Sequence, residues 1–100
     1  MDPAIPNIYV SDVVVSTAGH DAGAWFYVIS ADAQFLYLAN GMDRTLDKPK
    51  RKKRKHAQKV LRSETRVAGK LRLGDKVLNS ELRRDLAFLA NQMQANNLGG

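Results

Sequence analysis

The residues with the clearest chemical potential are seven lysines and arginines within the eight positions 48–55, KPKRKKRK. Side chains of this kind bind phosphate oxygens, and each contact releases counterions from a nucleic acid. Neighbouring like charges repel and resist compaction unless a polyanion neutralises them. Pro49 biases the residue before it toward an extended backbone and disfavours a helix here. We therefore predict an extended basic arm over residues 48–55 that folds against RNA.

We assign RNA binding to this arm and to the cationic and imidazole side chains near it. The candidate RNA-binding residues are Arg44, Lys48, Lys50, Arg51, Lys52, Lys53, Arg54, Lys55, His56, Lys59 and His20. For His56 two roles stay open, contact with a base or phosphate and the start of a returning strand. The basic run also fits a nuclear-import signal, because short lysine- and arginine-rich strings are read by import receptors. A merely solvated surface needs fewer cations than this run holds.

The basic charge is concentrated in one segment of the chain. Residues 1–43 contain five aspartates and no lysine or arginine, whereas residues 44–62 contain ten basic side chains and one acidic one. The whole chain of 100 residues carries a formal charge of +6. Such an uneven distribution predicts a polyanionic partner, either a nucleic acid or a membrane surface.

Catalysis, metal binding and disulfide bonding are not expected from this sequence. Cysteine is absent, which leaves His20 and His56 as the only imidazole ligands or bases. His20 and Asp21 are neighbours in a turn, where a base and its orienting group rarely point at one another, and no nucleophile or phosphate loop accompanies them. No apolar run approaches the roughly 20 residues of a membrane span. We expect a cytoplasmic, soluble protein that is not an enzyme, needs no cofactor or metal and does not enter a membrane.

The first half of the chain reads as a series of short strands in one mainly β domain. β-Branched and aromatic residues dominate 8–16, 25–30 and 35–40, and these runs are separated by TAGHDAG at 17–23 and by ADAQ at 31–34. The spacing is that of a β-meander, which a small barrel would close.

Three glycines, Gly19, Gly23 and Gly41, are expected to form the turns, because glycine adopts positive φ without steric cost. Asn40 and Gly41 together make a turn dipeptide, and residues 44–46 after it read as a short strand. The four aromatics of the predicted strands can stack on bases, although aromatics at strand spacing more often belong to a core. They are Trp25, Tyr27, Phe35 and Tyr37.

A leucine-rich helix is predicted at the end of the chain, from about residue 79 to 97. Its apolar residues recur at intervals of three and four, which places them on one face. They are Leu78, Leu82, Leu86, Leu89 and Met93. Asn79 or Ser80 is the expected cap. Because the predicted strands are apolar on both faces, we expect this helix to cover the outside of the barrel; a groove for a partner helix is the alternative. Residues 63–78 fit a helix, a strand or a linker equally well.

Three blocks of the sequence resemble the KOW motif of SH3-like barrels, and in particular the large-subunit ribosomal protein family called fourteen-e. The blocks are VVVSTAGHDAG at 13–23, ANGMDR at 39–44 and KPKRKKRKH at 48–56. The resemblance implies a KOW barrel with its basic arm over residues 8–62, after a leader at 1–7 and before a connecting segment and helix at 63–100. It implies binding to ribosomal RNA, with ribosomal proteins as further partners. The loop at 17–23 then lies at the RNA-facing edge, where its backbone N–H groups can bind phosphate.

Three positions depart from the family pattern. Ser11 stands where a glycine commonly opens the first strand, His20 replaces an arginine, and Asn40 replaces an aspartate. Since histidine is mostly neutral at pH 7, the loop is expected to hold phosphate less strongly than an arginine would. The alternative function is a protein-interaction module, in which the barrel and helix dock a protein and the basic arm only assists. The sequence fixes no oligomeric state.

Overall fold

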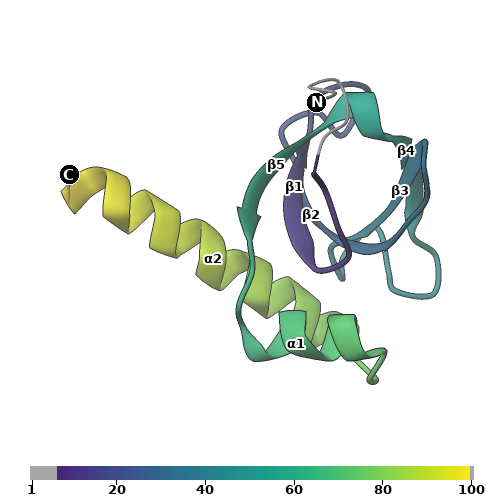
Figure 1. Cartoon of the computed structure of the whole chain (residues 1–100). Helices are drawn as coiled ribbons and strands as arrows, with labels where there is room; N and C mark the ends of the chain where they lie inside the picture. Colours follow the sequence, from purple (N-terminus) through teal and green to yellow (C-terminus); the bar gives the residue numbers. More distant parts are fainter. Residues whose placement is uncertain (1–6, 100) are drawn as a thin grey trace.

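The computed structural model describes residues 7–99, which form a curled antiparallel sheet with two helices beside it (Figure 1). Of the predicted leader at 1–7, only Asn7 lies within the described residues. The elements are β1 (Asp12–Ser16), β2 (Trp25–Ala31), β3 (Phe35–Ala39), β4 (Lys50–Lys53), the 3-10 helix η1 (Arg54–His56), β5 (Ala57–Arg62), α1 (Arg66–Leu73) and α2 (Asn79–Gly99). The strand order is β4-β3-β2-β1-β5. The prediction of a mainly β domain with a C-terminal helix is confirmed.

Alternation along the strands divides the apolar side chains between two cores, because successive residues of a strand point to opposite faces. Inside the curl lie Ile8, Val14, Phe26, Val28, Leu36 and Leu38, the inner core. Outside it, Val13, Tyr27 and Ala39 pack with Val67, Ala68, Leu82 and Leu86 of the two helices, the outer core. The expected cover on the outside of the strands is therefore present, and α1 shares the task with α2.

The basic run is part of the sheet and not a separate arm, so that prediction is wrong. Residues Lys50–Lys53 form β4, which pairs antiparallel with β3 at one edge of the sheet. The turn η1 then leads directly into β5 at the other edge (Figure 1). The predicted short strand at 44–46 reduces to a single bridge between Thr45 and Lys48. Of the two roles left open for His56, the strand begins immediately after it, at Ala57.

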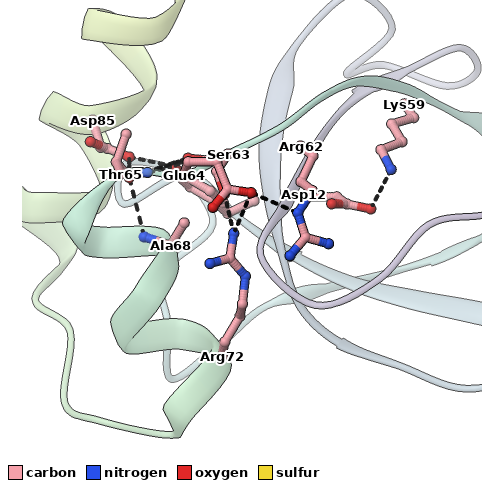
Figure 2. Close-up of polar contacts among 10 residues, drawn as sticks. Asp12, Lys59, Arg62, Ser63, Glu64, Thr65, Ala68, Arg72 and Asp85 are labelled. Carbon is pink, nitrogen blue, oxygen red and sulfur yellow. Dashed lines mark hydrogen bonds and ion pairs between the residues drawn. The ribbon is translucent and has the colours of Figure 1, made fainter.

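The unassigned segment 63–78 contains α1. Thr65 caps its N terminus by accepting a hydrogen bond from the Ala68 N–H, and Gly74 ends it with a left-handed φ of 75°. The residues before α1 also reach α2, as Figure 2 shows: the Thr65 hydroxyl donates to Asp85 Oδ2 at 2.8 Å. Ser63 Oγ lies 2.8 Å from the hydroxyl of buried Tyr27, which itself donates a hydrogen bond to Asp85. This network joins β2, α1 and α2.

Burial, together with the hydrogen bond to Asp85, raises the pKa of Tyr27 to about 12. The phenol therefore stays protonated through the neutral range and keeps its donor role, because its charged form would be both desolvated and next to a carboxylate. Among the buried side chains of the outer core, Tyr27 is the one that adds polar contacts to apolar packing.

The N terminus of α2 docks on the turn that follows β3. Asn79 Oδ1 accepts a hydrogen bond from Leu46 N–H at 2.9 Å, so this side chain serves the turn and not its own helix, contrary to its predicted role as a cap. Arg83 donates to the Gly41 carbonyl at 3.2 Å. The middle of the leucine face is used: Leu82 and Leu86 are buried and Leu89 packs against the outer core, whereas Leu78 is exposed. The end of α2 extends away from the sheet (Figure 1). No helix within residues 7–99 combines the length and apolarity needed to cross a membrane.

Ser11, which precedes β1, has a left-handed φ of 76°. Its N–H donates to the Val28 carbonyl at 2.8 Å, and its side chain is buried with no hydrogen-bond partner for the hydroxyl among the described residues. A left-handed backbone costs a residue other than glycine about 1–2 kcal/mol. The position thus carries strain that a glycine would not.

The substitution Ser11→Gly is expected to raise the free energy of unfolding by about 1 kcal/mol. It removes the backbone strain and the buried unpaired hydroxyl, and together these outweigh the extra conformational entropy that glycine gives to the unfolded chain. Urea unfolding measures the change. Ser11→Ala is the control that removes the hydroxyl and keeps the Cβ atom, and it should gain less. A glycine variant less stable than the alanine variant would contradict the assignment of strain.

Candidate nucleic-acid interface

The cations of β4 point to two sides of the sheet. The register pairs are Phe35 with Lys53, Leu36 with Lys52, Tyr37 with Arg51, and Leu38 with Lys50. Leu36 and Leu38 belong to the inner core, so their partners Lys50 and Lys52 lie on the inner face. The other two cations of the strand lie on the outer face.

Asp21, in the loop at 17–23, forms an ion pair with each of the two inward cations. Its Oδ1 lies 2.8 Å from Lys52 Nζ and its Oδ2 lies 2.8 Å from Lys50 Nζ. Lys52 is 7% exposed and also donates to Ser16 Oγ at 2.8 Å. Burial by itself would raise the pKa of Asp21, but hydrogen bonds from Lys50, Lys52 and Ser16 hold that pKa well below its ordinary value. This arrangement explains how so basic a run folds: an aspartate from another loop supplies the counter-charge.

Two further predicted RNA contacts are engaged within the protein. The Arg54 guanidinium donates to the Asp32 carbonyl at 2.8 Å and to the Ile8 carbonyl at 3.1 Å, which fastens η1 to neighbouring loops. Lys59 Nζ lies 3.2 Å from the carboxylate of Asp12, a side chain that is 1% exposed (Figure 2). These cations, like Lys50 and Lys52, serve the fold.

The remaining predicted contacts are mostly exposed. Five of them have no side-chain hydrogen bond or ion pair to another residue of 7–99: His20, Arg44, Lys48, Lys53 and Lys55. Arg51 is exposed as well, with its guanidinium 4.5 Å from the centroid of the Phe35 ring, and His56 is half-buried. The free groups are distributed over the segment before β4, the strand itself, η1 and the loop at 17–23. We call this set, with Arg51, the cationic edge.

The three turn glycines have the positive φ values that the sequence predicts. Gly19, Gly23 and Gly41 have φ values of 87°, 91° and 79°. In the loop at 17–23, the first two bracket Asp21 and let the chain fold back, so that Gly23 N–H donates to the Ser16 carbonyl at 2.8 Å. The turn places Asp21 beside β4.

Two aromatic side chains lie on the outer face beside the cationic edge. Phe35 and Tyr37 are half-buried and belong to neither apolar core of the described residues. Tyr27, by contrast, is in the outer core, and Trp25 packs against it. The spacing of these four aromatics along the sequence does not distinguish them. The strand order does, because it places β3 next to the charged strand, and the helices cover only the end of β3.

These features define a small mainly β domain with exposed cations on and around β4 and two further lysines of that strand paired with Asp21 on its inner face. Within residues 7–99 no cluster of three or more histidine, aspartate or glutamate side chains can hold a metal ion. No protein-family model and no curated protein matches the sequence of this chain. The site itself is thus the basis for inferring what the protein does.

Proposed function

We propose that this chain is an RNA-binding protein with a KOW-type SH3-like barrel and that it binds ribosomal RNA chiefly through phosphate contacts. The observation that carries the proposal is the cationic edge, whose exposed side chains lie on β4, on the segments before and after it and on the loop at 17–23, and form no ion pair with another residue of 7–99. Such groups are costly to gather on a surface unless a polyanion neutralises them. Phosphates do so with release of counterions.

Two features of the backbone and side chains support the likeness to KOW proteins. Ser11 has positive φ at the position where the family pattern has glycine. In addition, Asp21 of the first block pairs with Lys50 and Lys52 of the third block. This pairing gives a physical reason why the two blocks occur together, since the basic block needs the aspartate to become a strand.

The inward cations hold the outward ones in place. With Lys50 and Lys52 fixed by Asp21, the backbone of β4 is paired to β3 and presents Arg51 and Lys53 on a rigid surface. A rigid cationic surface loses less side-chain and backbone entropy on binding than a flexible arm. It therefore favours a structured RNA, in which the phosphates are also fixed.

Neutralising three exposed lysines together, Lys48→Gln, Lys53→Gln and Lys55→Gln, is expected to weaken RNA binding by roughly tenfold or more. The slope of log affinity against log salt should fall by about 3, or one for each phosphate that is no longer neutralised. The measurement is fluorescence anisotropy with a ribosomal RNA fragment over a salt series, repeated with an unrelated RNA of equal length. A greater affinity for the ribosomal fragment at high salt would support the ribosomal assignment.

A matched triple variant removes the same charge from cations that are paired within the protein. It combines Arg62→Gln, Lys70→Gln and Arg72→Gln, in which both arginines pair with Glu64 and the lysine pairs with Glu81, all away from β4. This variant should keep its affinity and its salt slope close to those of the unaltered chain. Equal losses in both triples would mean that only net charge matters. No loss in either would defeat the proposal and favour a protein-interaction module, for which Phe88, 52% exposed on α2, is the first side chain to examine.

A further inference from the structure

The outer face of the sheet is divided between a covered part and an open part. The helices cover Val13 of β1, Tyr27 of β2 and Ala39 at the end of β3, all of which are fully buried in the outer core. Phe35 and Tyr37, earlier on β3, are half-buried and lie outside both apolar cores of the described residues. Partly exposed aromatic rings beside cations form a surface on which unpaired bases can stack.

Each ring of the open part stands opposite a cation. Phe35 pairs with Lys53 and Tyr37 pairs with Arg51 across β3 and β4. The Arg51 guanidinium also lies over the Phe35 ring, 4.5 Å from its centroid, so the planar group is held against the sheet while it remains exposed. A base can stack on a guanidinium plane supported in this way as well as on an aromatic ring.

The Tyr37 ring is held by the turn that precedes β3. Its hydroxyl donates to Asp32 Oδ2 at 3.3 Å, while Asp32 Oδ1 accepts N–H groups from Gln34 at 2.9 Å and from Phe35 at 2.8 Å. The backbone hydrogen bonds from Phe35 and Gln34 lower the pKa of Asp32. The carboxylate is therefore engaged by the turn, and its role at this surface is to orient the ring.

The spacing of the two rings selects the form of the nucleic acid. Residues two apart on a strand are separated by about 6.6 Å, at a rise of about 3.3 Å per residue. This is about twice the 3.4 Å by which neighbouring bases of one strand are stacked in a duplex. Two successive bases can occupy both positions only if they are no longer stacked on each other, which costs least when the bases are unpaired.

We propose that Phe35, Tyr37, Arg51 and Lys53 form a stacking site for unpaired ribonucleotides on the outer face of β3 and β4. One base stacks on the guanidinium of Arg51 above Phe35, the next base stacks on Tyr37, and Lys53 contacts a phosphate between them. This proposal rests on the proposed function and adds to it that the RNA offers a loop, bulge or single-stranded end.

The first test varies the ligand and leaves the protein unchanged. A short oligouridine of about ten nucleotides is compared with an abasic ribose-phosphate strand of the same length and charge, and with a duplex of the same number of phosphates. The oligouridine should bind at least about tenfold more tightly than the abasic strand, given the strength of base stacking on such platforms. Equal affinities for the two strands would overturn the stacking site and leave phosphate binding intact. Failure of all three ligands to bind would defeat the proposed function as well.

The second test varies the site. In the double variant Phe35→Leu with Tyr37→Leu, the preference for oligouridine over the abasic strand should fall to about one, because leucine fills a strand position without offering a π-face. Tyr37→Phe alone should keep most of the preference, because the π-face remains although the hydrogen bond to Asp32 is lost. Circular dichroism shows that each variant is folded, and unchanged affinity for the abasic strand shows that its phosphate contacts are intact. A double variant that retains the full preference for bases would overturn the proposal.

Discussion

Gly41→Ala is expected to lower the free energy of unfolding by about 3 kcal/mol, from a left-handed φ forced on alanine and from overlap with a helix. Gly41 has φ 79°, and a Cβ atom at this position would overlap the carbonyl oxygen of Asn79 and lie 3.1 Å from the backbone N of Arg83. All three of the nearest atoms are backbone, so no change of rotamer relieves the overlap. The N terminus of α2 must move away from the sheet.

Gly23→Ala is the matched control for this prediction. Gly23 has φ 91°, and a Cβ atom there would meet no atom beyond its chain neighbours within 4 Å. Its substitution should cost about 1 kcal/mol, the backbone term alone. The difference between the two variants in urea unfolding isolates the docking of α2, and hydrogen exchange in α2 should accelerate only in Gly41→Ala. Equal costs would show that the close approach of the turn and the helix contributes nothing.

Asp21→Ala is expected to destabilise the fold by about 3 kcal/mol, because it leaves the ammonium group of Lys52 without its counter-charge at a position that is 7% exposed. The substitution removes two ion pairs of 2.8 Å that join the loop at 17–23 to β4. Without them, the charged strand repels itself. The measurement is the urea midpoint, compared with that of the double variant that also carries Lys52→Met.

The double variant should recover most of the stability, since an apolar side chain of similar length replaces a charge that has become unpaired. If Lys52→Met fails to rescue Asp21→Ala, the loop is held by other contacts. The cost of Asp21→Ala should also depend on pH with a definite sign. The pKa of Asp21 is lowered in the folded state, so its stabilisation is complete well above about pH 4, the ordinary value for aspartate, and declines as the pH falls further. The two proteins should therefore converge in stability under acidic conditions.

Local patterns in the sequence predict much of the fold. The strands β1, β2 and β3 match the β-branched and aromatic runs, and their turns contain the glycines that supply positive φ. The helix predicted at 79–97 is α2 at Asn79–Gly99. These elements are predictable because strand alternation, turn chemistry and helical periodicity are short-range properties of a chain. By the same reasoning α1 is missed: it has only eight residues, a glycine interrupts it, and its start depends on a threonine cap that also contacts α2.

The candidate site was predictable only as a set of charges. The run KPKRKKRK has cations at nearly every position and no apolar alternation, so nothing in it distinguishes the inward Lys50 and Lys52 from the outward Arg51 and Lys53. That distinction comes from the register with β3 and from Asp21, which lies about thirty positions earlier in the chain. The aromatic neighbours are likewise assigned by strand order and helical cover.

A mainly β domain with a basic surface follows from the amino-acid sequence without further information, because composition, turns and periodicity are local properties. Folding in three dimensions sets which cations are neutralised, which of them face RNA in the proposed function, and that the basic run is a strand and not an arm. The physical reason is that a charge has no fixed role until its partners are known. Asp21 comes close to the cations of the basic run only when the chain is folded. The helices likewise cover one part of the sheet, and leave the other part open, only in the folded chain.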